Sequence, residues 1–302
     1  MLRFLIGASF ALFLISCQDY GQLEMKGSLE RTLAEVSGLA LFEGDTLIYT
    51  ATDHGNPNII YGLDTSGNIV RELKISNAPN EDWEDLANDA EGTLYISDTG
   101  NNENDREDQF IYIIRNFNEL PRDATSATAE RLTFTLSDQE DYPPDLKNLN
   151  FDIESLIYKN EYLYLFTRNR SRNFDGVTKV YKLPALPGNF EAELIDEYYV
   201  CDDLNTCAIT GAAISSDGKT IALLTTNKIL LLSNFKEERF FSGDITTYET
   251  GYNSQKEGVA FKNDSTLYLV DERRAQTGGN LYEFSLKSVS YTHLTLPTIY
   301  SV

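Results

Sequence analysis

Acidic residues recur at one position of a short repeated pattern. Glu84, Glu154 and Glu257 each open a small apolar segment, in EDLA, ESLI and EGVA, and Ser37 and Thr210 open the related segments SGLA and TGAA. If the fold brings these positions together, the carboxylates repel one another unless a cation, basic residues or protonation offsets their charge. Hard divalent cations prefer clustered oxygen ligands. We therefore predict that Glu84, Glu154 and Glu257 bind calcium or another divalent cation.

A second polar position ends the apolar segment that follows each repeat. The residues there are Asp53, Asp98, Arg168, Asn227 and Asp271. We expect Asp98, Asn227 and Asp271 to act as further metal ligands. Asp53, the adjacent His54 and Arg168 are expected to line the same opening, where His54 could act as an acid or a base. The alternative for His54 is an ordinary histidine in a surface turn.

A rim of ion pairs is the alternative to a metal site. Arg168, Lys256 and Arg273 could lie between the carboxylates without any ion. In that case, removing one Glu would leave a basic partner unpaired, and no bound ion would be lost.

Five copies of the pattern organise the chain, and they begin at Ser37, Glu84, Glu154, Thr210 and Glu257. Each copy continues with a second and a third strand, and most copies have an outer fourth strand. Four antiparallel strands repeated around an axis form the blades of an all-β propeller. We predict five blades over residues 37–288, closed by a strand within residues 17–36; six blades are the alternative. The first strand of a blade lines the axis and the second runs back beside it, so the two polar positions should meet at one mouth.

The chain begins with features of a bacterial lipoprotein. Arg3 precedes an apolar run from Phe4 to Ile15, and the sequence LISC, ending at Cys17, resembles a lipobox. This run is shorter than the stretch of about 20 residues that spans a bilayer. We expect residues 1–16 to be removed as a signal peptide and Cys17 to carry the lipid. The exported protein would then be anchored at the outer membrane or cell surface. An ordinary signal peptide with an incidental cysteine is the alternative.

Residues 289–302 are expected to lie outside the fold. Val289 to Thr298 reads VSYTHLTLPT, which resembles one reading frame of a common sequencing adapter. Such a segment is excluded from reasoning about the fold, as a fusion scar would be. We therefore treat it as an artefact and expect the natural C-terminus to be missing.

Two cysteines bear on whether the chain holds a disulfide or a zinc site, and the overall charge bears on whether it binds nucleic acid. Cys201 and Cys207 could close a small disulfide in an oxidising compartment, or could remain two partly buried thiols. A zinc site lacks a second pair of Cys or His ligands. The formal net charge of −22 repels phosphate backbones, so we expect no nucleic-acid partner.

The repeats resemble two groups of propellers. The sequence EGVA at Glu257, with Glu84 and Glu154 at equivalent positions, is similar to the regucalcin and gluconolactonase-like propellers. In that family the Glu that opens the first strand is a divalent-metal ligand beside an Asn and an Asp, which implies Glu257, Asn227 and Asp271 as ligands here. The set SGLA, DWEDLA, ISDTGNN and TGAAISSDG more closely resembles exported bacterial propellers over residues 36–287. That second resemblance implies the fold but no activity.

Two functions use the predicted mouth. The first is a surface or periplasmic lipoprotein that binds a small molecule, a glycan or a protein at its acidic opening, around calcium if a metal is present. The second is a metal-dependent hydrolase of lactone or phosphoester type, in which a metal-bound water is the nucleophile. Enzymatic use requires an open coordination position and a base, whereas binding requires neither.

Overall fold

The computed structural model describes residues 18–275 and 277–287 of the chain. The predicted lipid anchor at Cys17 and the adapter-like segment 289–302 lie outside the described residues. Within them strands are the main regular structure, and the helices are α1 (Leu204–Cys207) and the 3-10 turns η1 (Arg31–Leu33), η2 (Phe117–Glu119) and η3 (Phe240–Ser242). None of these helices is long and apolar enough to cross a membrane.

The main strands form antiparallel groups of four. The first group is β2 (Val36–Ala40), β3 (Ile48–Thr52), β4 (Ile59–Leu63) and β5 (Ile69–Ile75), with β9 (Ser126–Ala127) added in parallel to β5. The second is β6 (Trp83–Asn88), β7 (Leu94–Asp98), β8 (Gln109–Ile114) and β10 (Glu130–Leu136). The third is β11 (Asp152–Lys159), β12 (Tyr162–Arg168), β13 (Val177–Pro184) and β14 (Gly188–Tyr199), which pairs in parallel with β10. The fourth is β15 (Gly211–Ile214), β16 (Thr220–Leu224), β17 (Lys228–Ser233) and β18 (Asp244–Glu249). The last is β19 (Lys256–Asn263), β20 (Thr266–Asp271), β21 (Asn280–Ser285) and β1 (Glu24–Ser28).

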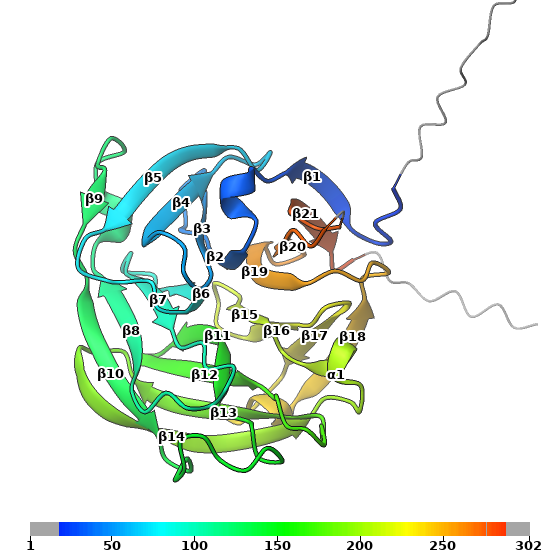
Figure 1. Cartoon of the computed structure of the whole chain (residues 1–302). Helices are drawn as coiled ribbons and strands as arrows, with labels where there is room; N and C mark the ends of the chain where they lie inside the picture. Colours follow the sequence, from blue (N-terminus) through cyan, green and yellow to red (C-terminus); the bar gives the residue numbers. More distant parts are fainter. Residues whose placement is uncertain (1–17, 276, 288–302) are drawn as a thin grey trace, which may run out of the picture.

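These groups surround a common axis (Figure 1). The innermost strands β2, β6, β11, β15 and β19 contact one another in turn, and β19 contacts β2. Antiparallel four-stranded sheets arranged around an axis are the architecture of a β-propeller. The predicted β-propeller class is therefore confirmed.

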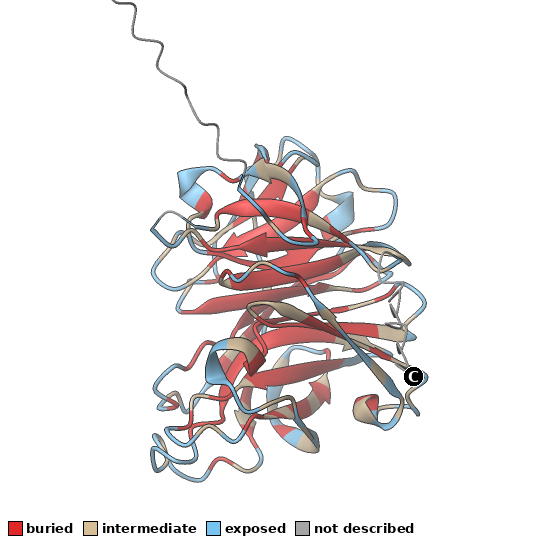
Figure 2. Cartoon of the chain, turned by 90° about the vertical axis from the view of Figure 1, so that its right-hand side faces the viewer, coloured by how far each residue is buried: buried red, intermediate tan, exposed pale blue. Residues whose placement is uncertain are grey.

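The pattern of burial differs between inner and outer strands. Every residue of β2, β3 and β7 is buried, because neighbouring sheets cover both faces of these strands (Figure 2). In the outer strand β5, Arg71, Leu73 and Ile75 are buried while Val70 and Glu72 are exposed. That alternation is the period of a strand with one covered face. The ends of the inner strands are thus the places on the axis where polar side chains can meet.

Side-chain hydroxyls at the mouth end of three sheets bond to the beginning of the next innermost strand. Three such bonds run from Ser37 to the carbonyl of Glu84, from Thr99 to that of Ile153 and from Thr210 to that of Lys256. Each bond fixes the mouth end of one sheet against the beginning of the following innermost strand. The relative heights of the mouth residues are therefore determined by buried hydrogen bonds.

Asp85 ties three innermost strands together at the axis. Its Oδ1 accepts from the backbone N–H of Leu86 at 2.8 Å, and its Oδ2 accepts from Leu156 of β11 at 2.9 Å and from Ala212 of β15 at 3.4 Å. Burial raises the pKa of Asp85 well above its ordinary value, against the opposite effect of these N–H donors. Asp85 therefore couples the second, third and fourth sheets.

The disulfide between Cys201 and Cys207 closes the loop that precedes β15, with a Cα–Cα distance of 5.4 Å. Helix α1 lies inside this loop, and Asp203 caps it by accepting from the backbone N–H of Asn205 at 3.0 Å.

Replacing Asp85 by Ala should leave three buried N–H groups without an acceptor. Such a group costs about 1–3 kcal/mol, so we expect Asp85→Ala to lower the free energy of unfolding by about 3–5 kcal/mol. Asp85→Asn keeps a carbonyl oxygen and should lose less. Urea denaturation compares both variants with Glu72→Gln, an exposed position of β5. If Asp85→Ala were as stable as Glu72→Gln, Asp85 would not couple the three strands.

Candidate functional site

A cavity of about 450 Å³ opens where the innermost strands begin. Its lining residues come from the first, second, third and last sheets, and all of them are charged or carry an amide. They are Asp53, Glu84, Asn102, Glu154, Arg168, Arg170, Gln255, Glu257, Glu272 and Arg274. The three glutamates that open repeats therefore lie around one cavity, together with Asp53 and Arg168. His54 lies beside it, with its Nδ1 at 2.6 Å from the carbonyl oxygen of Glu81 and 3.9 Å from Asp82 Oδ1.

Three other predicted ligands do not line the cavity. Asp98 accepts from the backbone N–H of Asp82 at 3.0 Å and pairs with Arg106 at 3.2 Å. Asp271 accepts from the N–H of Asn280 and from the hydroxyl of Tyr282, both at 2.9 Å. Asn227 belongs to the fourth sheet, which contributes no lining residue.

A one-residue offset explains where Asp98 and Asp271 lie. They pair across their sheets with Trp83 and Lys256, each of which precedes the Glu that opens its repeat. In the first sheet the residue before the repeat is Val36, and it pairs with Thr52. Asp53 therefore lies one residue beyond the position that Asp98 and Asp271 occupy in their sheets. Successive side chains of a strand point to opposite faces, so the positions are not equivalent. The counterpart of Asp53 in the last sheet is Glu272, and both line the cavity.

Arginines neutralise one part of the mouth. Arg168 Nη1 lies 3.0 Å from Glu154 Oε2 and 3.5 Å from Glu257 Oε1, which links the third sheet to the last one across the opening. Arg170 contacts Glu154 and Asp152, each at 2.6 Å. A further pair joins Arg274 to Glu272 at 2.6 Å. The charge-assisted hydrogen bonds from Arg168 and Arg170 to Glu154 and Asp152 hold these side chains firmly.

Lys256 and Arg273, the other two basic residues expected at the rim, lie elsewhere. The ammonium group of Lys256 donates to the carbonyls of Thr226 and Tyr252 at 2.8 and 2.7 Å. Arg273 donates to the carbonyl of Leu29 at 2.7 Å. Sequence position alone suggested that they face the carboxylates, but their side chains serve backbone carbonyls instead.

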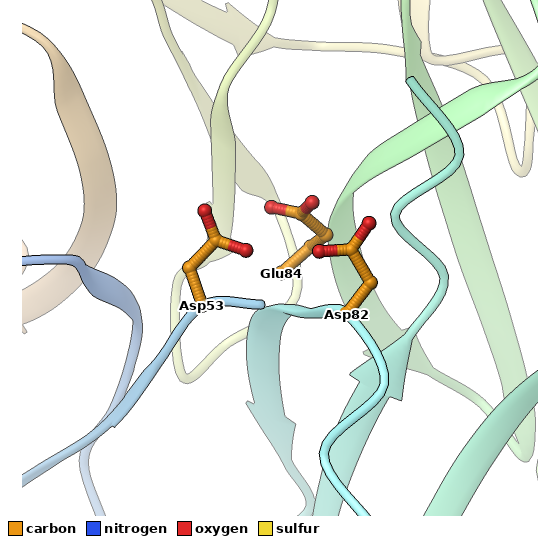
Figure 3. A group of neighbouring side chains, drawn as sticks. All are labelled: Asp53, Asp82 and Glu84. Atoms are coloured by element: carbon orange, nitrogen blue, oxygen red, sulfur yellow. The ribbon is translucent and has the colours of Figure 1, made fainter. Parts of the chain in front are cut away.

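Asp53, Asp82 and Glu84 form the other part of the mouth, and we call them the acidic triad (Figure 3). One ligand atom from each lies within 4.8 Å of the others, and the three carboxylates point toward a common space. Asp82 is 9% exposed, and its Oδ1 has no hydrogen-bond partner among the described residues. No arginine or lysine of the described chain pairs with the triad.

Gly100 provides the space beside the triad. A Cβ at this position would lie 2.3 Å from Asp82 Oδ2 and 2.3 Å from Glu84 Oε1. Any other residue would therefore displace both carboxylates. The backbone of Gly100 also donates to the carbonyl of Asp82 at 3.2 Å, which holds the two segments together.

Burial and mutual repulsion shift the titration of the acidic groups. Burial raises the pKa of Asp82 to about 8, with a further contribution from Asp53. The pKa of Glu84 is raised well above its ordinary value by burial and by the charge of Glu154. Burial acts on Glu154 as well, but Arg168 and Arg170 outweigh it and lower its pKa. Asp82 and Glu84 therefore hold protons more readily than Glu154 does. Burial also raises the pKa of Asp152 and Glu272 to about 7 and that of Glu257 well above its ordinary value, although arginines lie beside them.

The site contains residues that the sequence reasoning missed, although a signal for them exists. Asp82 and Asp152 each stand two residues before a repeat-opening Glu, and Gln255 stands two residues before Glu257. Residues two apart on a strand share a face, so these positions also reach the mouth. Three other lining residues lie one to three positions after the second strands of their sheets, outside the repeated strand pattern: Arg170, Glu272 and Arg274.

The comparisons with known proteins support the fold and do not identify an activity. No protein-family model matches the sequence, and neither does any curated protein. The PQQ-bound aldose sugar dehydrogenase of Streptomyces coelicolor is similar in structure, with a TM-score of 0.51 and 11% identity over 87% of this chain and 97% of that chain. Hydrazine synthase of Kuenenia stuttgartiensis matches with a TM-score of 0.43 and 13% identity over 82% of this chain and 70% of that one. The Swd1 β-propeller domain of Myceliophteria thermophila matches with a TM-score of 0.41 and 10% identity over 83% of this chain and 97% of that chain. The first likeness supports the propeller fold, and the two lower scores carry no argument.

Asp82 and Glu84 should make stability depend on pH when no divalent cation is present. The folded chain keeps protons on carboxyl groups such as Asp82, pKa about 8, that the unfolded chain releases near pH 4. Folding is therefore favoured at low pH, and this advantage is lost as the pH rises from 5 to 8. We expect the melting temperature in EDTA to fall over that range, by about 2–4 °C for each kcal/mol lost.

Asp82→Asn carries an uncharged amide at all pH values, so its melting temperature should fall less between pH 5 and 8. Calorimetric scans in EDTA at four pH values measure the difference, with Glu72→Gln as the control. A variant curve parallel to that of the wild type would show that Asp82 does not hold the proton.

Proposed function

We propose that this protein is a ligand-binding β-propeller whose mouth holds a divalent cation, calcium first, between Asp53, Asp82 and Glu84. The observation that carries the proposal is the uneven neutralisation of the mouth. Arginines pair with Glu154, Glu257, Glu272 and Asp152, whereas no arginine or lysine of the described residues pairs with the triad. The buried, unpartnered Oδ1 of Asp82 supports the same assignment.

The ligand set suits a hard cation. Calcium takes six to eight oxygen ligands, and three carboxylates supply three to six of them. Asp53 and Glu84 line the cavity, so the remaining positions would face a space of about 450 Å³. That volume is in the range of sites for small molecules. Relative to the sequence prediction, the proposal keeps Glu84, adds Asp53 and Asp82 as ligands, and assigns Glu154 and Glu257 to the ion-pair network.

We also infer that the five sheets are the complete set of blades and that β1 closes the ring. Two observations support this. The innermost strands β19 and β2 are in contact, and β1 pairs antiparallel with β21 from Glu24 opposite Glu283 to Ser28 opposite Asn280. A strand from the start of the chain then covers the edge that β21 would otherwise expose. A closed ring keeps the mouth residues at fixed separations.

Calcium should bind to the wild-type protein and raise its melting temperature. A ligand present at a hundredfold excess over its Kd stabilises the folded state by about 2.7 kcal/mol. Glu84→Gln and Asp82→Asn each remove a charged ligand, so we expect both to weaken calcium binding by at least about tenfold. Isothermal titration calorimetry at pH 7.5 after treatment with EDTA measures the three affinities.

Glu272→Gln is the matched control for this titration. It removes one carboxylate from the same cavity, but from the side chain that Arg274 already neutralises. Its calcium affinity should stay within about threefold of the wild type. If calcium gave neither binding heat nor a thermal shift with the unmutated protein, the cation proposal would be rejected. If Glu84→Gln, Asp82→Asn and Glu272→Gln weakened calcium binding equally, the effect would be one of overall charge and not of a defined site.

A metal-dependent hydrolase of lactone or phosphoester type is the second candidate, and the position of His54 is the observation that favours it. Its Nδ1 faces the carbonyl oxygen of Glu81, so Nδ1 donates there and Nε2 is left to accept a proton. His54 also lies 3.9 Å from Asp82 of the triad. It could serve as the base that the hydrolase requires.

His54→Gln tests the hydrolase candidate. If the calcium-loaded protein hydrolyses simple lactones or phosphodiesters, the variant should lose about 10²–10⁴-fold in rate while it keeps its calcium affinity. Absence of turnover by the wild type, with calcium bound, would leave the binding function and reject the hydrolase.

A further inference from the structure

Three arginines that line the cavity use only part of their hydrogen-bonding capacity. Arg168 donates through Nη1 alone, to Glu154. Arg170 donates through Nε and Nη2, and Arg274 contacts Gln255 and Glu272 through the same two atoms. Within the described chain, no residue accepts from Arg168 Nη2, Arg170 Nη1 or Arg274 Nη1. Each guanidinium therefore retains an amino group for a ligand in the cavity.

A buried carboxyl group on the same wall is also short of partners. Glu257 is 3% exposed, and its Oε1 has no hydrogen-bond partner among the described residues, although Arg168 Nη1 lies 3.5 Å away. A buried polar atom without a partner is costly unless a ligand or water completes it. Arg168 lacks an acceptor and Glu257 Oε1 lacks a donor, so together they point to an absent group in the cavity that carries both an acceptor oxygen and an O–H or N–H donor, independently of the acidic triad.

The lining restricts what that group can be. No lining side chain is apolar or aromatic, so the cavity offers no face for stacking a sugar ring or for an alkyl chain. Guanidinium groups match the planar oxygen pair of a carboxylate and also bind phosphate. The cavity is lined by five carboxylates and three arginines, and Asp82 and Asp152 lie close by. Even with a divalent cation present, the mouth disfavours a phosphate dianion more than a singly charged carboxylate.

We infer that the ligand of this mouth is a small carboxylic acid. Its carboxylate is bound by the unused amino groups of Arg168, Arg170 and Arg274, and a neighbouring oxygen of the same molecule reaches the cation at the triad. The second contact rests on the proposed cation site, whereas the arginine contact does not. A hydroxyl group next to the carboxylate would place both kinds of oxygen in one small molecule.

Glycolate is the smallest probe with these two features. We expect it to bind the calcium-loaded wild type, and we expect Arg274→Gln to bind it about tenfold more weakly, because one charged hydrogen-bond donor is lost. The control is Arg115→Gln, which breaks an exposed ion pair with Glu130 away from the mouth and should bind glycolate as the wild type does. Glycolamide, which lacks the negative charge, and methyl phosphate complete the calorimetric series.

The outcomes separate this inference from the proposed cation. Equal glycolate affinity of Arg274→Gln and the wild type, equal binding of glycolamide, or tighter binding of methyl phosphate would each overturn the carboxylate assignment while leaving calcium binding intact. If calcium itself does not bind, the cation proposal fails. Glycolate binding that persists in EDTA and is weakened in Arg274→Gln would then still support the arginine contact.

Discussion

Buried hydrogen bonds between innermost strands fix the geometry on which the rest of this propeller depends. Asp85 accepts backbone N–H groups from its own strand and from two others, so it holds three sheets at one level on the axis. Hydroxyl bonds such as that from Thr99 to the carbonyl of Ile153 set the neighbouring strand starts at the mouth. Because those starts carry Glu84, Glu154 and Glu257, the same bonds that build the axis also force carboxylates together.

The mouth resolves this crowding in two different ways. Arg168 and Arg170 bind Glu154 and Asp152, and burial of these ion pairs is tolerable since each of the two carboxylates has an arginine within hydrogen-bond distance. Around Glu84 and Asp82 no such partner lies among the described residues, and the pKa of Asp82 is raised to about 8. An unpaired acidic cluster lowers stability, and proteins keep such sites where a ligand or chemistry uses them. This contrast is the physical basis for placing the cation and the ligand on different walls of one cavity.

The sequence predicted the fold well and the site in part, for identifiable reasons. Repeat spacing and strand periodicity are local properties, so the propeller and the meeting of Glu84, Glu154 and Glu257 at one mouth could be inferred without coordinates. The sequence did not show which residues at the ends of the second strands face the cavity. A one-residue offset decides whether a side chain points into the cavity, as Glu272 does, or into its own sheet, as Asp271 does. Loop arginines fall outside the repeat and carry no periodic signal. Which carboxylates they neutralise is a tertiary property.

The central claim is that a divalent cation lies between Asp53, Asp82 and Glu84, and anomalous diffraction from crystals of the protein grown with calcium tests it most directly. The account predicts one strong anomalous peak at about 2.3–2.6 Å from carboxylate oxygens of all three residues, with Arg168 still paired to Glu154. A peak between Glu154 and Glu257 with Arg168 displaced, or no peak at the mouth at a calcium concentration that saturates binding in solution, would contradict it.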